Sequence, residues 1–222
     1  MKKIKFPNGM SEDLAELVGI HLGDGYLSLD KKYDYTISYA GNLQKDKVFM
    51  EYINNQYLSL FGTKLKIVLN IKRNSIVLRI RSKSLHNFLK NSLNIPTGRK
   101  TDLVIPDYVK SDKKYLAAFL RGLFDTDGCV VLQKQGKYNY ILLKICTKHN
   151  NFAKEIQEGL TFLNIPSFVT KKDTSVNHKS FVGYDVVVRN KNTAKFFEIV
   201  GSRNPRNFTK YKDMGTRGLS RT

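Results

Sequence analysis

The sequence carries one short pattern twice, first as Leu17-Val-Gly-Ile-His-Leu-Gly-Asp-Gly25 and again as Leu120-Arg-Gly-Leu-Phe-Asp-Thr-Asp-Gly128. Both stretches read L-x-G-φ-x-x-x-D-G, where φ is an apolar residue. The aspartates of the two copies, Asp24 and Asp127, are 103 residues apart (127 − 24 = 103). A pattern that recurs at a long, fixed spacing indicates two copies of one structural unit, so the repeat is the first guide to the fold.

The residues around the motif repeat as well. The offset of 103 continues downstream without a gap, and the residues that it relates are Lys45 and Lys148, Phe49 and Phe152, and Ile53 and Ile156. Later, Arg81-Ser-Lys83 matches Arg189-Asn-Lys191 at an offset of 108, which predicts additional loop residues in the second copy. We therefore expect an N-terminal arm over 1–10, repeats over 11–113 and 114–213, and a flexible tail over 214–222.

Each copy is expected to fold in the order αββαββα. In the first copy a helix begins at Ser11, a favourable N-cap that is followed by acidic residues. Strands near 26–29 and 35–40, a helix around 49–60, a hairpin whose first arm is 64–72 and a helix over 84–93 follow. The first arm of the hairpin alternates, and its apolar face, expected to be buried, is Leu65, Ile67, Leu69 and Ile71. The sequence predicts an α+β fold with pseudo-two-fold symmetry. Two saddle-like antiparallel sheets would each have one face under helices and one face open, with the motif helices packed at the centre.

The motif residues themselves predict a helix interface and a cation site. Gly19 and Gly122 lie in mid-helix, where glycine costs about 1 kcal/mol relative to alanine, so we expect them to permit close helix packing. Asp24 and Asp127 would then meet at the ends of the two helices. A carboxylate is poorly placed at a helix C-terminus, and two of them require a cation. Hard oxygen ligands favour Mg²⁺, which suggests phosphodiester hydrolysis.

The charge balance points to a polyanionic partner. The chain has 38 Lys and Arg against 19 Asp and Glu, a net charge of +19, and the basic residues are spread along its length. Such an excess favours nucleic acid and a folded basic surface over a disordered basic arm. No apolar run approaches the roughly 20 residues of a membrane span. The two cysteines, Cys129 and Cys146, match neither a zinc site nor a disulfide framework, so an intracellular protein in cytoplasm, nucleoid or organelle is expected.

The open, polar face of each sheet is the expected DNA-binding surface. An antiparallel sheet can lie along the major groove, where every base pair presents its own pattern of donors and acceptors. Alternation along the strands and the adjoining loops selects the candidates for DNA contact. They are Ser28, Asp30, Lys32, Tyr35, Tyr39, Lys66, Asn70, Lys72, Arg79, Arg81, Gln133, Gln135, Tyr138, Tyr140, Lys144, Lys148, Lys172 and Arg189.

The paired motifs resemble those of the LAGLIDADG (dodecapeptide) homing endonucleases, and the resemblance covers about Ser11 to Asp213. It implies a two-motif monomer that cuts double-stranded DNA with Mg²⁺, with Mn²⁺ as a substitute and Ca²⁺ as an ion that binds without cleavage. By the same resemblance the eighth motif residues, Asp24 and Asp127, are catalytic metal ligands. The preceding backbone carbonyls, of Gly23 and Thr126, are further ligands.

Three more catalytic candidates follow from the resemblance. The family surrounds its metals with Gln and Lys side chains, and Gln44 matches such a position, whereas its counterpart Thr147 departs from the pattern. Lys100, in Pro96-Thr-Gly-Arg-Lys100, matches the segment that supplies a basic residue, and Lys210 is its looser counterpart in the second half. Each lysine could equally be a phosphate contact.

Two other classes of function stay open on the sequence. A protein of this fold could be an RNA maturase or a DNA-binding regulator that does not cleave, although binding of its own intron RNA is not indicated. A basic ribosome-associated protein would explain the charge but not the repeated Asp-Gly. Because both motif acids are present, and because the chain begins with Met and ends with Thr unlike inteins of this family, we expect an intron-encoded endonuclease that makes a double-strand break in a long asymmetric target.

Overall fold

The computed structural model describes residues 4–29, 34–136, 138–176 and 179–219. The first half contains α1 (Glu12–Gly23), β1 (Gly25–Leu27), β2 (Thr36–Asn42), α2 (Lys47–Phe61), β3 (Lys66–Asn70), β4 (Ser75–Arg81), α3 (Lys83–Asn87) and the π-helical turn η1 (Phe88–Ser92). The second half contains α4 (Asp107–Lys110), α5 (Lys113–Asp127), β5 (Gly128–Gln135), β6 (Tyr138–Thr147), α6 (Asn150–Phe162), β7 (Phe168–Val176), β8 (Lys179–Arg189), α7 (Asn192–Ile199) and α8 (Pro205–Leu219). The predicted αββαββα repeat is confirmed.

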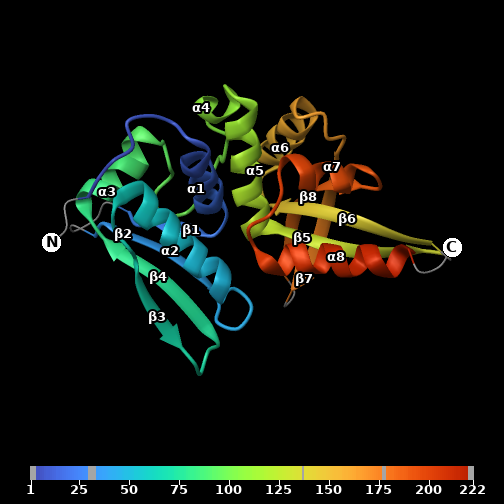
Figure 1. Cartoon of the computed structure of the whole chain (residues 1–222), viewed down its shortest axis with the longest axis horizontal. Helices are drawn as coiled ribbons and strands as arrows, with labels where there is room; N and C mark the ends of the chain where they lie inside the picture. Colours follow the sequence, from blue (N-terminus) through green and yellow to red (C-terminus); the bar gives the residue numbers. More distant parts are fainter. Residues whose placement is uncertain (1–3, 30–33, 137, 177–178, 220–222) are drawn as a thin grey trace.

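Two four-stranded antiparallel sheets flank a central pair of helices (Figure 1). Their strand orders are β1-β2-β4-β3 and β5-β6-β8-β7, so the two halves have the same topology. Helix α2 packs on β2 and β4, and α6 packs on β6, β7 and β8. One face of each sheet is therefore buried under helices, as the sequence predicted for an α+β fold.

The motif helices α1 and α5 form the most extensive contact between helices in the molecule. Both helices are capped at their starts, where Ser11 accepts a hydrogen bond from the Leu14 amide and Asp112 accepts one from the Lys114 amide. A Cβ added to Gly19 would lie 2.1 Å from the carbonyl oxygen of Phe119 on α5. A Cβ on Gly122 would lie 2.2 Å from the carbonyl oxygen of Glu16 on α1. The two glycines thus permit the backbones to touch.

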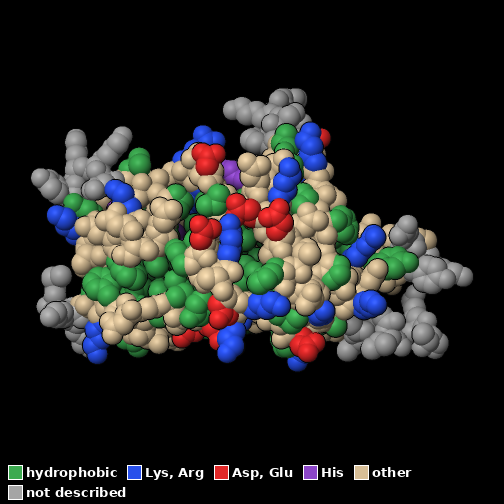
Figure 2. All heavy atoms as spheres, turned by 90° about the horizontal axis from the view of Figure 1, so that it is seen from above, with side chains coloured by type: hydrophobic (Ala, Val, Ile, Leu, Met, Phe, Trp, Pro, Cys, Tyr) green, Lys and Arg blue, Asp and Glu red, His purple; other side chains and the backbone are tan. Residues whose placement is uncertain are grey.

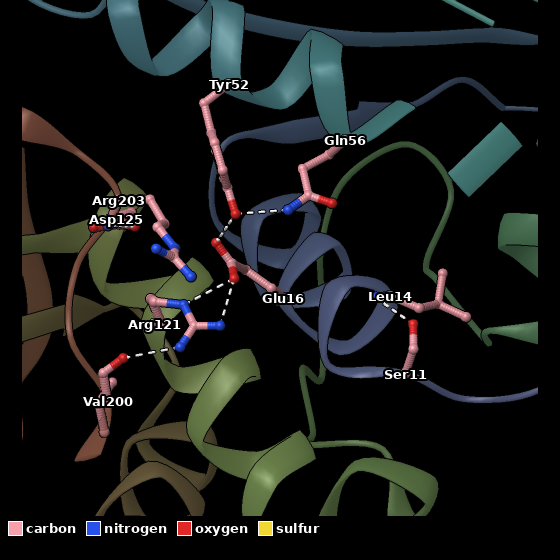
Figure 3. A network of polar contacts seen from close by, with 9 residues as sticks. All are labelled: Ser11, Leu14, Glu16, Tyr52, Gln56, Arg121, Asp125, Val200 and Arg203. Carbon is pink, nitrogen blue, oxygen red and sulfur yellow. Dashed lines mark hydrogen bonds and ion pairs between the residues drawn. The ribbon is translucent and has the colours of Figure 1, made fainter. Parts of the chain in front are cut away.

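A buried polar network also joins the motif helices, and Figure 3 shows it from close by. The carboxylate of Glu16, which is fully buried, accepts hydrogen bonds from Arg121 Nε at 2.8 Å and from the Tyr52 hydroxyl at 2.6 Å. Arg121 Nη2 lies 2.6 Å from the same carboxylate, and Nη1 donates to the carbonyl oxygen of Val200 at 3.2 Å. These partners offset the desolvation of both charges.

The pseudo-two-fold repeat does not reproduce this ion pair. At the motif offset of 103, Glu16 corresponds to Phe119 and Arg121 corresponds to Val18. The contact therefore joins two unlike helices, and each charged residue has an apolar counterpart in the other half.

The repeat offset changes along the chain, which corrects the assignment of strand faces in the first half. Gly25 pairs with Tyr39 in the first sheet, and the equivalent Gly128 pairs with Ile145 in the second. The offset at these inner strands is thus 106 (145 − 39 = 106), although it is 103 in the helices on either side. A shift by an odd number of residues exchanges the two faces of a strand. Lys144 is accordingly equivalent to Ser38, whereas the constant offset had paired it with Gly41.

Two expectations about buried and flexible segments also differ from the structure. Ile67, Leu69 and Ile71, expected on the buried side of the first hairpin, are 44%, 53% and 83% exposed because β3 and its turn form the sheet edge. Residues 214–219, expected as a flexible tail, continue helix α8.

Charge is mixed on the face that Figure 2 shows from above, where Lys and Arg side chains lie among Asp and Glu near the middle of the molecule. This face is therefore not a uniformly basic surface. None of the helices in the described part of the chain is long and apolar enough to cross a membrane.

Candidate active site and DNA-binding face

The ends of the two motif helices bring Asp24 and Asp127 to one place between the sheets. Asp24 follows the last residue of α1, where its amide donates to the carbonyl of Ile20, and Asp127 is the last residue of α5. Gly23 permits the approach, because a Cβ there would lie 2.0 Å from Thr126 Oγ1 and 3.3 Å from Asp127 Oδ2. The convergence that the repeat predicted is therefore present in the structure.

Burial raises the pKa of both carboxyl groups. The pKa of Asp127 is raised to about 7, first by desolvation and second by the charge of Asp24, while Lys100 opposes the shift. Desolvation also raises the pKa of Asp24; Asp46 adds to this shift, and the positive charges of Lys100 and Arg206 oppose it. Two carboxylates held together out of water create a local demand for positive charge.

Lys100 supplies one positive charge at this place. Its Nζ donates a hydrogen bond to the carbonyl of Leu22 at 3.0 Å and a second, short one to the carbonyl of Gly23. Burial lowers the pKa of Lys100 to about 8, and the charges of Asp127 and Asp24 oppose that shift. The segment after Pro96 therefore delivers its lysine to the motif carboxylates, the position predicted from the sequence.

The raised pKa of Asp127 predicts how metal-free stability depends on pH. A carboxyl group with a folded pKa of about 7 and an ordinary value of 3.8 keeps its proton in the folded state over that range but loses it on unfolding. The folded state therefore binds more protons, and its stability falls as the pH rises from about 4 to about 7. Asp127→Asn removes this penalty. In EDTA, the thermal unfolding temperature of the variant should rise relative to that of the parent protein as the pH increases across this range. A difference in unfolding temperature that does not change with pH would contradict the burial of this charge.

The residues around Asp24 and Asp127 fit a hard divalent cation. Both carboxylates and the Gly23 carbonyl are oxygen ligands, and that carbonyl already accepts a bond from the Lys100 ammonium, a cation. The described residues contain no group of three or more His, Cys, Asp or Glu side chains that could hold a metal ion. Mg²⁺ is commonly bound by one or two carboxylates together with water and substrate phosphate, which matches this sparse set.

The other two catalytic candidates lie in different settings. Gln44 is exposed in the turn between β2 and α2, where its amide donates to Asn42 Oδ1 at 3.0 Å. Lys210 is exposed on α8. It lies close enough to β5 to affect Cys129: a hydrogen bond with Cys146 lowers the pKa of the Cys129 thiol, and the positive charges of Lys144 and Lys210 lower it further. The geometry thus sets Lys210 near β5, whereas Lys100 contacts the motif itself.

A segment after α7 closes the end of the second motif helix. The carboxylate of Asp125 accepts a short hydrogen bond from Ser202 Oγ and one from the Arg203 amide at 2.7 Å, and Asn204 Nδ2 donates to the Asp125 carbonyl at 2.9 Å. Asn207 Nδ2 donates to the carbonyl of Phe124 at 3.2 Å. Burial raises the pKa of Asp125 to about 7, and hydrogen bonds from the Ser202 side chain and from the backbone of Arg203 and Asn204 oppose the shift. Both oxygens of the Asp125 carboxylate therefore accept hydrogen bonds from within the protein, which indicates a structural role.

In the first sheet the structure confirms one part of the predicted open face and corrects another. Ser38 pairs with Arg79 and Lys66 also pairs with Arg79, so these three residues share one face. Arg81, Asn70 and the turn residue Lys72 are exposed nearby. Tyr39 does not reach this face, because it is 1% exposed and bonded to His21 Nδ1 at 2.8 Å.

Three further candidates of the first half lie outside this open face or outside the described residues. Ser28 is 1% exposed and its hydroxyl bonds to Asp34 and Thr36, so it is not a DNA contact. Tyr35 packs edge-on against His86 at the end of the sheet. Asp30 and Lys32 lie outside the described residues.

In the second sheet the predicted face is largely where the sequence placed it. Gln133 pairs with Tyr140, Lys144 pairs with Cys129, and Arg189 pairs with Leu142, all on one face. Lys172 and Lys148 are exposed beside it. Gln135 and Tyr138 pair in the same backbone register, and their side chains lie outside the described residues.

The structure adds three charged residues that the sequence reasoning missed. Asp185 on β8 forms an ion pair with Lys144 at 3.0 Å, so this lysine does not face DNA as an isolated cation. Asp46 and Arg206 form a second pair beside Asp24. An acid that follows a polar turn and an arginine 160 residues later (206 − 46 = 160) have no shared sequence signal, because only folding brings them together.

Similar sequences agree with this architecture. Residues 114–201 match the LAGLIDADG-like domain. An uncharacterized protein of Methanocaldococcus jannaschii is 25% identical over 144 residues, which are 64% of this chain and 50% of that protein. A DNA polymerase of Thermococcus litoralis is 26% identical over 208 residues, which are 89% of this chain and 12% of the polymerase. The chain thus spans half or less of these two relatives.

Solved structures of similar fold cover nearly the whole chain. The crystal structure of I-DmoI in complex with DNA and Ca matches with a TM-score of 0.59 and 17% identity, over 91% of this chain and 97% of that one. The homing endonuclease I-GzeII in complex with its DNA target matches with a TM-score of 0.54 and 14% identity, over 92% and 87%. Residues 114–201 thus match the LAGLIDADG-like domain, and the chain as a whole, with two motifs, two equivalent sheets and a central α1–α5 pair, has a fold similar to that of I-DmoI.

Proposed function

We propose that this chain is a site-specific endonuclease that makes a double-strand break in a long, asymmetric DNA target with Mg²⁺. The observation that carries the proposal is the buried pair Asp24 and Asp127, which lie at the meeting point of the two helices with the Lys100 ammonium against the Gly23 carbonyl. A purely structural pair of glycine-packed helices does not require two buried acids at its end.

The chain's own residues would share the work of hydrolysis. Bound Mg²⁺ activates water and stabilises the leaving oxygen of a phosphodiester. Asp24, Asp127 and the Gly23 and Thr126 carbonyls would hold the cation. Lys100, with a pKa lowered to about 8, sits where it can donate a hydrogen bond to a phosphate oxygen or orient water. Gln44 could orient a second water from the neighbouring turn. The basic face of both sheets would align the duplex.

The two halves differ where they would meet bases, which supports an asymmetric target read by one monomer. Lys144 and its buried partner Asp185 lie on the predicted DNA-binding face of the second sheet, and the equivalent of Lys144 in the first sheet is Ser38. A symmetric pair of sheets would favour inverted repeats. Structures of the relatives with DNA and Ca, and with DNA and Mn, make duplex DNA and these ions reasonable probes for this chain.

Cleavage of a plasmid library tests the proposal directly. We expect the full chain with Mg²⁺ to leave double-strand ends at one non-palindromic sequence, and Mn²⁺ to substitute for Mg²⁺. Ca²⁺ should support binding of the recovered target without cleavage. Sequencing of the ends identifies the target. Specific binding to DNA or to a structured RNA with no cleavage in any of these ions would instead favour the regulator or maturase.

Binding to the recovered target should weaken steeply with salt. With about ten phosphate contacts, the slope of log K against log[salt] should approach roughly −9, because each neutralised phosphate releases condensed counterions. Titrations in Ca²⁺ between about 50 and 200 mM salt, the range over which such contacts change affinity most visibly, measure the slope. A flat dependence would mean that the net charge of +19 does not serve DNA binding.

A further inference from the structure

Arg206, at the start of α8 in the second half, reaches the first half beside the motif carboxylates. Its Nη1 lies 3.1 Å from Oδ1 of Asp46, and the side chain of Asp46 is 16% exposed. The charges of both residues act on Asp24, Asp46 raising its pKa and Arg206 lowering it. The ion pair therefore crosses between the halves close to the candidate active site.

Asp46 holds the turn that carries Gln44. Its Oδ2 accepts a hydrogen bond from the Asn42 amide at 2.8 Å, and its own amide donates to the Asn42 carbonyl at 2.9 Å. Asn42 Oδ1 in turn accepts bonds from the amides of Gln44 and Lys45, both at 3.0 Å. The conformation of Gln44 thus depends on the contact between Asn42 and Asp46.

Arg206 is itself fixed to the second motif helix. Its amide donates to Asn204 Oδ1 at 3.2 Å, and Asn204 Nδ2 donates to the Asp125 carbonyl at 2.9 Å. Asp125 lies two residues before Asp127. A continuous set of polar contacts therefore runs from the end of α5, through Asn204 and Arg206, to Asp46 and the Gln44 turn.

The Asp46 carboxylate depends on Arg206 for compensation. Its buried Oδ1 forms no hydrogen bond within the described part of the chain, so the guanidinium is the charge that faces it. The Asp46 side chain is 16% exposed and that of Arg206 is 43% exposed, so water partly screens the pair. A partly buried carboxylate that loses its cation moves further toward water or takes up a proton. Either response would disturb the Gln44 turn.

Among the described residues, the second half has no equivalent of this arrangement. Four residues, 43–46, connect β2 to α2, whereas two residues, Lys148 and His149, connect β6 to α6. At the offset of 103, His149 stands where Asp46 does and Thr147 stands where Gln44 does. The ion pair that contacts the Gln44 turn is thus specific to the first-half side of the candidate active site.

We propose that Arg206 is a positioning residue that, through Asp46, fixes the turn that carries Gln44 beside Asp24, so that cleavage of one DNA strand depends on it. The proposal rests on the proposed nuclease function. In this proposal, Arg206 at the start of α8 connects the end of α5, the second motif helix, to the turn between β2 and α2 in the first half.

Hydrogen exchange of the free, full chain tests the contact without DNA. Arg206→Gln should make the amides of Gln44 and Lys45 exchange about tenfold faster, because the turn loses its charged support. Arg206→Lys should restore part of the protection. Lys212→Gln removes one positive charge from the same helix and should leave both amides unchanged. Unchanged exchange in Arg206→Gln, or equal acceleration in Lys212→Gln, would overturn the proposal.

Strand-resolved cleavage of the recovered target tests the consequence. With each strand labelled, Arg206→Gln should cut one strand about tenfold more slowly and accumulate nicked duplex, with unchanged affinity in Ca²⁺. Equal slowing of both strands would reject the one-sided role. Weaker binding with a salt slope reduced by about 1 would make Arg206 a phosphate contact instead. If the parent protein cuts no DNA, the proposed function fails, and the exchange measurement still decides whether Arg206 holds the turn.

Discussion

Asp127→Asn and Asp24→Asn are each expected to slow DNA cleavage about 1,000-fold or more while leaving binding nearly intact. Each substitution keeps the size of the side chain but removes a negative ligand from a site that two carboxylates build. Charge stabilisation by a bound cation contributes several kcal/mol to a transition state, and each 1.36 kcal/mol is a factor of ten in rate. The phosphate and base contacts that we propose for the two sheets do not involve these acids. Single-turnover cleavage and Ca²⁺-supported binding of the recovered target separate the two effects.

Asp112→Asn is the matched control for these two substitutions. It makes the same chemical change in the same helix as Asp127, but at the opposite end, where Asp112 caps α5 and is exposed. Asparagine is an equally good N-cap, so cleavage and stability should both stay close to those of the parent protein. Full cleavage by Asp24→Asn or Asp127→Asn would remove that residue from the metal site. Loss of binding together with cleavage would point to a structural role.

Gly122→Ala is expected to lower the free energy of unfolding by about 2–3 kcal/mol, although alanine is the better helix former. The new Cβ would lie 2.2 Å from the Glu16 carbonyl oxygen and 2.8 Å from the Ile20 amide nitrogen. Both obstacles are backbone atoms of α1, so no side chain can rotate away and the helices must separate. Separation would also stretch the buried bonds between Glu16 and Arg121. Denaturant unfolding of the full chain measures the loss.

Gly159→Ala is the corresponding control. Gly159 is also a buried glycine within a helix, α6, but its Cβ would meet only side-chain atoms, the nearest being Leu116 Cδ1 at 3.3 Å. A small rotation of that leucine can accommodate the methyl group, and the helix propensity gain of about 1 kcal/mol offsets the crowding. We expect little change in stability. Equal losses in both variants would show that any added methyl in the core is harmful, and that the α1–α5 contact is not special.

The sequence by itself determined the repeat, the order of elements and the position of the acids. The motif L-x-G-φ-x-x-x-D-G lies within one helix, so the positions of its glycine and its final Asp along that helix do not depend on how the helix packs. Duplication then placed Asp24 and Asp127 at equivalent helix ends, and the pseudo-two-fold arrangement brought them together. Lys100 was found for a similar reason, because its short segment resembles one that the family uses for a lysine.

Only the tertiary structure decided which strand faces are open in the first half. The offset between the copies rises from 103 to 106 at the inner strands and returns to 103 in the next helix. Compensating insertions of this kind leave the helices aligned but exchange the faces of the strand between them. Tyr39 was therefore predicted to face DNA and is instead buried against His21 and Tyr57. Apolar residues such as Ile71 were expected inside and lie at an edge that no helix covers.

Ion pairs between residues far apart in the chain could likewise not be predicted from the sequence. Glu16 with Arg121, Lys144 with Asp185 and Asp46 with Arg206 are each separated by 41 to 160 residues, and a surface charge and a buried pair look the same in a sequence. Whether such a residue is free to meet DNA depends on which partner folding places within hydrogen-bond distance. Local chemistry thus determined the helices and the motif acids, whereas the packing of the two halves decided what surrounds the acids, because those neighbours come from the other half of the chain.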